Sequence, residues 1–224
     1  MHLEYYNSKH EVVPSVTTII KIFNKDGLLQ WANAIGKRGI DYTRYLNNKA
    51  IFGTLVHELI ESDLLGKDPA IIGHANMLDE AMDLVEKFKL VKQDLHIANV
   101  MSEISLSCDT YGGTIDLICD IISADGKPIK ILGDFKTSKT VYETQFIQLG
   151  GYLNLIKINM SDIYDQIQQC VIFSITADKI VMRYISKADC EAYFTKIFLR
   201  LLDVYNAWAD IKKVYKDLYI SKQY

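Results

Sequence analysis

Apolar residues in the first half of the chain recur with the period of an α-helix. From Phe52 they fall three or four positions apart as far as Ile60, and a second such run extends from Met77 to Phe88. This spacing gathers apolar side chains on one helical face. Ser15 is placed to cap a helix over residues 15–23, and residues 28–50 read as helical, with breaks at Gly36 and Gly39.

The period changes after residue 99. Three short runs rich in isoleucine and leucine, separated by turn signals, predict a three-stranded meander, and two further strands follow a helical stretch. The expected strands are 100–109, 114–122, 129–135, 168–176 and 180–186, with helices over 142–157 and 187 to about 215. We therefore expect one α/β domain, in which a mainly helical part (1–98) precedes a sheet core (99–186) and a long C-terminal helix (187–224).

Composition narrows the class of protein. The chain has 224 residues, 49% of them hydrophobic, and a formal charge of −3, so any nucleic-acid binding must come from a local basic patch. No apolar run is long enough to span a bilayer, and no secretory or transit signal is seen at the N-terminus. These features predict a cytoplasmic protein that does not bind a membrane.

The four cysteines show no metal-binding pattern. Cys108, Cys119, Cys170 and Cys190 form no C-x-x-C pair and no cluster with histidines at zinc-finger spacing. Reduced thiols are the simplest interpretation, and we expect no iron–sulfur cluster and no structural zinc.

Polar residues at the ends of two expected strands suggest chemistry. Asp134 and Lys136 in "GDFKTSK" lie two positions apart, so they leave a strand on the same face, roughly 6–7 Å apart along the backbone. Asp116 sits among Ile115, Leu117 and Ile118, where an ionised carboxylate is costly unless it is paired or bound to a metal. If the two strands pair, Asp116 and Asp134 meet, and two carboxylates at one place call for a cation. The alternative is a structural ion pair at an exposed strand end.

Three more side chains lie on expected helices. His57, in "GTLVHELIE", is either a packed core residue or a metal ligand, and the zinc-protease motif is excluded because Glu61 stands where a second histidine is needed. Gln148 and Tyr152 in "QLGGY" are four residues apart and share one helical flank, which is also what an ordinary amphipathic boundary would give.

These motifs follow one another in a definite order. G-T-x-x-H, then G-x-x-D, D-x-K and Q-x-x-x-Y occur between residues 53 and 152, and "VPSVTTII" precedes them. This order resembles the RecB-like exonuclease branch of the PD-(D/E)XK nucleases, in particular phage and mitochondrial genome-maintenance exonucleases and, more distantly, CRISPR-associated adaptation nucleases. The resemblance implies a mixed central sheet flanked by helices. Two positions depart from the family name: Ile115 replaces the proline, and the acid before Lys136 is an aspartate.

The resemblance also implies roles for individual residues. His57, Asp116, Asp134 and the backbone carbonyl of Phe135 would bind a divalent metal, with Glu103 as a weaker candidate ligand. Lys136 would act on the attacking water and stabilise charge. Gln148 and Tyr152 would orient the site or contact DNA, as would Ser138 and Lys139. Oxygen ligands favour Mg²⁺ or Mn²⁺, and one imidazole shifts the preference toward Mn²⁺.

A basic and aromatic segment could hold the substrate. Residues 21–49 carry six lysines and arginines against two aspartates, with Trp31, Lys37 and Arg38 among them. Phosphate contacts combined with aromatic stacking are typical of single-strand channels, although a solvated helical face explains the same composition. The acid-rich residues 58–86 are expected to face away from DNA, apart from groups that serve the metal.

The function expected from these features is that of a metal-dependent deoxyribonuclease, with DNA as its partner. An exonuclease acting on single strands or DNA ends in recombination, repair or replication fits the resemblance, in the cytoplasm of a bacterial or phage-infected cell. A structure-selective endonuclease, a DNA-binding module without catalysis and a scaffold subunit remain as alternatives.

Overall fold

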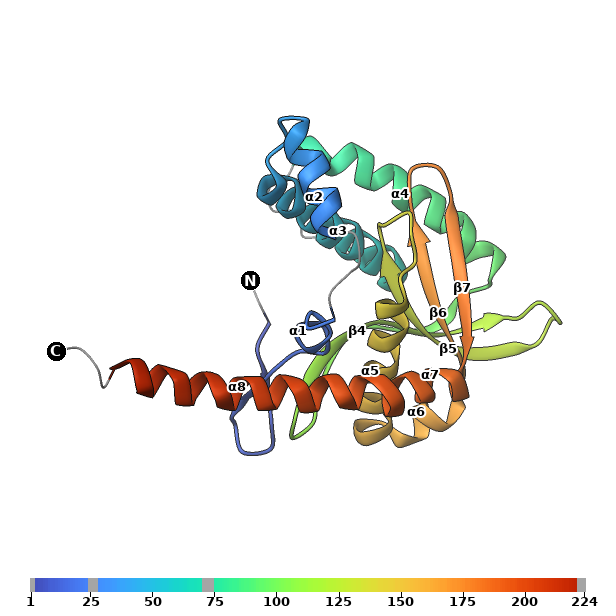
Figure 1. The fold of residues 1–224 in the computed structure, drawn as a ribbon. Coiled ribbons are helices and arrows are strands. Elements are labelled where there is room, and N and C mark those ends of the chain that lie inside the picture. The colour runs from blue at the N-terminus through green and yellow to red at the C-terminus, as the bar shows by residue number, and fades with distance from the viewer. Residues whose placement is uncertain (1–2, 24–27, 70–74, 221–224) are drawn as a thin grey trace.

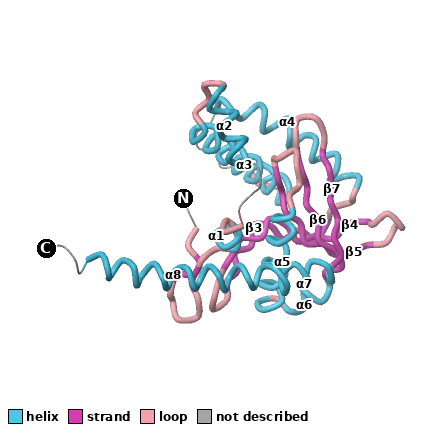
Figure 2. Tube along the Cα trace, in the orientation of Figure 1, coloured by secondary structure: helices cyan, strands magenta, loops and turns pink. Residues whose placement is uncertain are grey.

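The computed structural model describes residues 3–23, 28–69 and 75–220. Within these residues the chain forms a five-stranded mixed sheet with helices on both faces, and a separate two-stranded hairpin at the N-terminus (Figures 1 and 2). The α/β class expected from the sequence is confirmed, with a helical N-terminal part and a long C-terminal helix.

The strands follow one another across the sheet in chain order. Strands β3 and β4 pair antiparallel, as do β4 and β5, which confirms the predicted meander, and β6 and β7 form a further antiparallel pair. Strand β6 is parallel to β5, and the crossover runs through α5 and α6. The bounds are β3 (Ala98–Ser107), β4 (Gly112–Ile122), β5 (Pro128–Lys136), β6 (Ile167–Ile175) and β7 (Ile180–Ser186).

Each face of the sheet has its own apolar core. Helices α3 (Tyr42–Leu65) and α4 (Ala75–Asp94) cover one face, where Phe52, Val56 and Phe88 pack on side chains from β4 to β6. On the other face, Val16, Leu153 and Phe198 contribute to a second cluster. That cluster is built by α1 (Val16–Ile20), α5 (Glu143–Asn159), α6 (Ser161–Gln166), α7 (Lys187–Tyr193), a π-helical turn (Phe194–Phe198) and α8 (Leu199–Ile220). The far part of α8 extends well beyond the sheet (Figure 1).

The helix boundaries correct one detail of the sequence prediction. Gly36 lies inside α2 (Leu28–Lys37) and does not break it. The break comes at Gly39, whose φ of 72° favours glycine, and Asp41 then caps α3 by accepting a hydrogen bond from the backbone N–H of Arg44. The predicted cap at Ser15 is confirmed, since its side chain accepts from the N–H of Thr18.

A short N-terminal hairpin was not predicted. Strand β1 (Tyr5–Tyr6) pairs antiparallel with β2 (Val12–Val13), and a single bridge joins Ser15 to Gly112 at the start of β4. Two-residue strands leave almost no periodic signal in a sequence, so pattern reasoning could not find them. The hairpin matters because it brings Tyr5 to the start of β4.

Strand β4 is irregular at Asp116. Ile115 belongs to the core cluster on the α5 face, whereas Leu117, two residues later, belongs to the cluster on the α3 face. Residues two apart in a regular strand share a face, so β4 changes its facing at Asp116. On β3, Glu103 has a φ of 51°, and its neighbours Ser102 and Ile104 pair with Leu117 and Ile115. Such irregularities redirect side chains, and they are frequent beside active sites.

Two further observations bear on the class of protein. Among the described helices, none combines the length and the apolar character that crossing a membrane requires. Cys119, Cys170 and Cys190 are buried, and Cys108 is half-buried at the start of the β3–β4 turn.

Candidate functional site

Three side chains from three elements meet beside the irregular part of β4. His57 comes from α3, Glu103 from β3 and Asp116 from β4, and one ligand atom of each lies within 4.8 Å of the others. His57 Nδ1 is 3.5 Å from Asp116 Oδ2. The same carboxylate oxygen accepts a hydrogen bond of 2.8 Å from the backbone N–H of Phe135. These contacts form a candidate metal site, and they bring together two residues that are 59 positions apart in the sequence, His57 and Asp116.

The main chain of the sheet supports this arrangement. Ser102 donates a 2.7 Å hydrogen bond from its hydroxyl to the backbone carbonyl of Asp116, which joins β3 to β4 at the irregular position. The ring of Phe135 packs edge-on against the imidazole of His57, with centroids 5.9 Å apart. The predicted use of the Phe135 carbonyl as a ligand stays a prediction.

Asp134, on β5, points toward α5 and is fully buried. Strand β4 pairs with β5 so that Leu117 faces Gly133, which places Asp116 and Asp134 at adjacent positions, as expected for hairpin partners. Asp134 Oδ2 lies 2.5 Å from Lys136 Nζ, so the two residues of "GDFKTSK" do share a face. Among the described residues, no hydrogen bond of good geometry reaches this oxygen, so the lysine is an ionic rather than a well-aligned partner. Asp134 Oδ1 accepts a 3.0 Å hydrogen bond from Gln148 Nε2.

Gln148 and Tyr152 support Asp134 from α5. Gln148 Nε2 also donates to the hydroxyl of Tyr152 at 2.8 Å, which confirms that the two residues share one flank of the helix. Both side chains are buried, so they are more than the boundary of an amphipathic helix. They fix the carboxylate of Asp134 in place, because a buried amide whose N–H groups are both engaged has little freedom to rotate.

The electrostatics of the site keep the imidazole neutral. Burial lowers the pKa of His57 to about 4, and the positive charge of Lys136 adds to this effect, while Asp134 and the backbone of Phe135 oppose it. Burial also raises the pKa of Asp116, against the influence of Lys136 and of the Phe135 N–H. A neutral imidazole keeps a free lone pair, which is the form that binds a metal.

The Asp134–Lys136 pair behaves differently. Burial raises the pKa of Asp134 to about 6, with Asp116 adding to the rise and Lys136 opposing it. For Lys136, burial lowers the pKa, but the attraction of Asp134 and Asp116 outweighs it and the net shift is upward. The lysine is therefore held as a cation beside the two aspartates.

The three-residue group opens into a cleft of about 450 Å³ with an acidic lining. Partial burial raises the pKa of Glu103 to about 7, and repulsion from Asp116, Glu61 and Glu58 adds to the rise. No lysine or arginine is found among the described residues that line this cleft. Glu58 and Glu61 of the acid-rich segment thus lie at the candidate metal site, and the expectation that the rest of this segment faces away from DNA stays a prediction. The lining residues are Tyr5, Thr54, His57, Glu58, Glu61, Glu103, Thr114, Asp116 and Tyr152.

The donor set fits a divalent cation. Bond lengths of about 2.0–2.1 Å put adjacent ligand atoms of an octahedral Mg²⁺ shell about 3 Å apart and opposite atoms about 4 Å apart. The 4.8 Å limit found for His57, Glu103 and Asp116 is close to this range, so small side-chain rotations would complete the set. Several like charges in a partly enclosed cleft also lower the free energy of a cation bound there.

Other predicted residues lie elsewhere. Trp31 and Lys37 are on α2, and Arg38 directly follows it; α2 packs against α3 and, like the far part of α8, reaches beyond the sheet (Figure 1). Trp31 makes edge-on contacts with Tyr42 and Tyr45, at centroid distances of 5.7 Å. Trp31, Lys37 and Arg38 are not among the described residues that line the cleft. Lys25 and Asp26 of the basic segment fall outside the described residues.

The loop after β5 engages its own neighbours. The hydroxyl of Ser138 donates to the backbone carbonyl of Thr140, and its own carbonyl accepts from Ser174. Lys139 forms an exposed ion pair of 2.5 Å with Asp178 in the β6–β7 turn. A role for Ser138 and Lys139 toward DNA stays a prediction.

Sequence reasoning missed several residues of the cleft. Tyr5, Thr54 and Thr114 line it, and none of them was singled out from the sequence, although Thr54 belongs to the G-T-x-x-H motif. Thr114 could have been found, because it precedes Asp116 by two positions on the same strand. Tyr5 could not, since only the tertiary fold brings β1 to β4.

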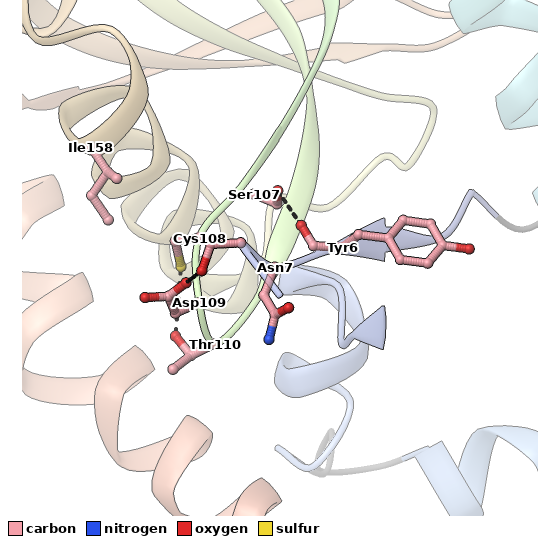
Figure 3. A pocket seen from close by; sticks show the side chains of 8 residues that line it. Tyr6, Asn7, Ser107, Cys108, Asp109, Thr110 and Ile158 are labelled. Atoms are coloured by element: carbon pink, nitrogen blue, oxygen red, sulfur yellow. Dashed lines mark hydrogen bonds between the residues drawn. The ribbon is translucent and has the colours of Figure 1, made fainter. Parts of the chain in front are cut away.

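A second cavity lies apart from the carboxylates. It has a volume of about 590 Å³ and is formed by the N-terminal hairpin, the β3–β4 turn and Ile158 of α5 (Figure 3). Asp109 is the single carboxylate among its described lining residues, and it accepts a hydrogen bond from Ser8. This cavity is larger than the acidic cleft, but its described lining residues include no group of side chains that could hold a metal ion.

Comparisons with known proteins find matches among solved structures. No protein-family model matches the sequence, and no curated protein sequence matches it. Over most of the chain, the structure matches phage-related and alkaline exonucleases at low sequence identity. The phage-related exonuclease from Haemophilus somnus 129PT is 15% identical, with 92% of this chain and 99% of that chain covered and a TM-score of 0.39.

Two other solved structures are similar over a smaller share. The alkaline exonuclease LHK-Exo from Laribacter hongkongensis is 16% identical, with 72% of this chain and 84% of that chain covered and a TM-score of 0.31. The structure of SSO0001 is also 16% identical, with 66% and 74% covered and a TM-score of 0.31. At such identities a likeness concerns the fold, and the role of this chain has to be derived from its own site.

Proposed function

We propose that this chain, as a single nuclease domain, is a metal-dependent deoxyribonuclease that acts as an exonuclease on single-stranded DNA or DNA ends. One observation supports this above all others: ligand atoms of His57, Glu103 and Asp116 converge within 4.8 Å, and Asp116 adjoins the buried Asp134–Lys136 pair. A cation site next to a fixed lysine is what hydrolysis of a phosphodiester needs.

The metal would be held by His57, Asp116 and Glu103, with Asp134 and the Phe135 carbonyl as further ligands if the lysine yields one oxygen. Carboxylate oxygens favour Mg²⁺ or Mn²⁺, and the imidazole favours Mn²⁺ of the two. When bound, such an ion acidifies a water molecule and withdraws charge from a phosphate oxygen. It would also relieve the mutual repulsion of the carboxylates, which is a stabilising contribution to the fold.

The residues around the metal position the reacting groups. Lys136 Nζ, held beside Asp134 and attracted by Asp116, can donate hydrogen bonds to a non-bridging phosphate oxygen and stabilise the added negative charge. Gln148 fixes the orientation of Asp134, and Tyr152 in turn fixes Gln148. Asp116 is fixed by the Phe135 N–H, so its oxygens need little reorganisation during the reaction.

The acidic cleft also implies how DNA is bound. Without a cation, four carboxylates would repel a phosphate, so binding at the cleft depends on the metal. Trp31 and Lys37 of α2, with Arg38 after it, would bind the part of the strand that lies outside the cleft, by phosphate contacts and stacking. A single strand bends into such a path more readily than a duplex.

The decisive experiment uses one sequence in several forms. End-labelled linear single-stranded DNA, linear duplex and a covalently closed single-stranded circle are incubated with Mg²⁺, with Mn²⁺ or with EDTA. We expect metal-dependent degradation of the linear single strand to short products, slower loss of the duplex and survival of the circle. Asp116→Asn is the control for a contaminating nuclease, since it should abolish the signal.

Each other outcome selects another function. Equal loss of circular and linear strands would indicate a structure-selective endonuclease. DNA binding without hydrolysis, measured by fluorescence anisotropy, would indicate a binding module without catalysis. Neither binding nor hydrolysis, with or without metal, would leave a scaffold as the function.

A further inference from the structure

Tyr5 brings an aromatic ring into the acidic cleft from the far end of the sequence. It lies on β1, is half-buried and lines the same cleft as His57, Glu103 and Asp116. Its hydroxyl is 2.9 Å from the hydroxyl of Thr114, and the Thr114 hydroxyl is in turn 3.0 Å from that of Ser105. The chain of hydroxyl groups fixes the ring between the hairpin and the β3–β4 strands.

Two consecutive glycines create the space for this ring and for Tyr152. A Cβ added at Gly112 would lie 2.4 Å from the Cβ of Tyr5, and one added at Gly113 would lie 2.6 Å from Cε1 of Tyr152. No real side chain tolerates such contacts, so "GG" before "TID" allows two tyrosines to approach β4 closely at the cleft. The arrangement is a built position rather than a chance contact of a loose N-terminus.

The two walls of the cleft differ in chemistry. The α3 wall presents His57 and two glutamates, whereas the hairpin wall presents Tyr5. A cleft of about 450 Å³ falls in the range of about 300–1,000 Å³ of pockets for small molecules, which suits one nucleotide and is too small for a duplex. A nucleotide offers both matching surfaces, since its phosphate is drawn to a metal and its base has an apolar face.

From this placement we infer that Tyr5 forms a nucleobase-binding subsite, against which the base next to the scissile phosphate packs. The inference rests on the proposed nuclease function and adds a substrate-positioning residue to it. Tyr5 holds the strand so that the phosphate, and not the base, reaches His57 and Asp116. Because Thr114 already restrains the ring, little side-chain freedom is lost when a base packs on it.

The test compares variants of one hairpin on matched substrates. Tyr5→Ala should raise the KM for a single-stranded oligonucleotide about tenfold, which corresponds to about 1.4 kcal/mol, with a smaller change in kcat. Tyr5→Phe keeps the ring and should raise KM much less. Tyr6→Ala is the matched control, because Tyr6 is the neighbouring residue, is 46% exposed and bonds through its hydroxyl to Glu4.

An abasic nucleotide separates base packing from a structural role. On a substrate that lacks the base next to the scissile phosphate, the KM of the wild type should rise by about the same tenfold. The KM of Tyr5→Ala should be the same on the abasic and the intact substrate. Thr114→Val is a second variant for the case that the hairpin misfolds in Tyr5→Ala. It keeps the ring of Tyr5 but removes the hydrogen bond that restrains it, so it should raise KM by a smaller factor than Tyr5→Ala. Melting curves of all variants confirm that each is folded.

Failure of the inference and failure of the nuclease function look different. If the wild type cleaves DNA while Tyr5→Ala has an unchanged KM, or loses activity equally on intact and abasic substrates, Tyr5 is no base subsite and the nuclease stands. If the wild type neither binds nor cleaves nucleic acid, both are wrong.

Discussion

On the α5 side of the sheet, Asp134 is fully buried, with one oxygen on Gln148 and the other beside Lys136. On the α3 side, Glu103 is exposed to an open cleft and shares it with Glu58 and Glu61, with no basic residue among the described residues of the lining. Asp116 stands between the two, where β4 changes its facing. The charge of Asp134 is thus compensated within the protein by Lys136. The carboxylates of the cleft have no such partner among the described lining residues.

The difference follows from how each side is packed. A buried charge must be compensated within the fold, because removing it from water costs several kcal/mol. A carboxylate at the edge of a cleft keeps part of its hydration and can stay unpaired until a cation arrives. The α5 side therefore holds its charged pair in a fixed position, and the α3 side leaves negative charge that a bound cation would neutralise.

The largest effect should come from Asp116, which belongs to both sides. Asp116→Asn keeps the size of the side chain but removes the charge that faces His57, so we expect hydrolysis to fall more than a hundredfold. Changes to groups that merely support a metal ligand already cost about 10–100-fold. Titration with Mn²⁺ followed by calorimetry should show weaker binding. Cleavage near the wild-type rate would show that Asp116 is not a ligand.

Lys136→Met tests the paired side. It leaves the buried carboxylate of Asp134 without its cation, which costs roughly 3–5 kcal/mol and should lower the Tm by roughly 6–20 °C in a domain of this size. The double variant Asp134→Asn with Lys136→Met should recover most of the Tm but none of the hydrolysis.

A matched control for this prediction is Lys127→Met. Lys127 forms an exposed ion pair of 3.3 Å with Asp125, and such pairs contribute about 0–1 kcal/mol, so its Tm should hardly move. A double variant that melts no higher than Lys136→Met would show that the pair is not the source of the lost stability.

The open side is tested by His57→Ala and Glu103→Gln. Both should raise the Mn²⁺ concentration needed for half-maximal rate, about tenfold or more for His57 and less for Glu103, which is the more exposed ligand. Glu61→Gln lies in the same cleft but outside the three-residue group, so it should shift the metal requirement least. If His57→Ala only lowers the melting temperature and leaves the metal requirement unchanged, the imidazole is a core residue.

The sequence predicted the helices and strands better than it predicted the contacts between them that form the site. The meander, the crossover helix and the last two strands follow from periodicity, because each of these elements is long enough to show it. The adjacency of Asp116 and Asp134 also followed from strand pairing. The sequence offered Glu103 only as a weak candidate ligand. Its place at the site depends on its left-handed backbone, φ 51°, and on the register of β3 and β4, which are set by the tertiary structure.

The boundary between site and surface was harder to predict. Glu58 and Glu61 look like an ordinary solvated face of a helix, and only the position of α3 over β3 and β4 brings them to the cleft. Tyr5 carries no periodic signal at all. Charge and aromatic content on α2 are visible in the sequence, but their use depends on where α2 lies relative to the bound strand.

The smallest effect should come from α2, which belongs to neither side of the sheet. Lys37 and Arg38 are exposed and lie outside the described lining of the cleft, so replacing both by alanine should raise KM severalfold and change kcat little. Because these groups would release counterions on binding phosphates, the variant should also depend less on salt, with the slope of log KM against log salt reduced by about one to two. Lys67→Ala with Lys89→Ala is the control, since Lys67 follows the end of α3 and Lys89 of α4 pairs with Asp63 and Glu86, so both should leave the slope unchanged. If the double variant leaves KM and the salt slope unaltered, α2 is a solvated helical face. If kcat falls by as large a factor as KM rises, these residues act in the chemical step and not only in substrate binding.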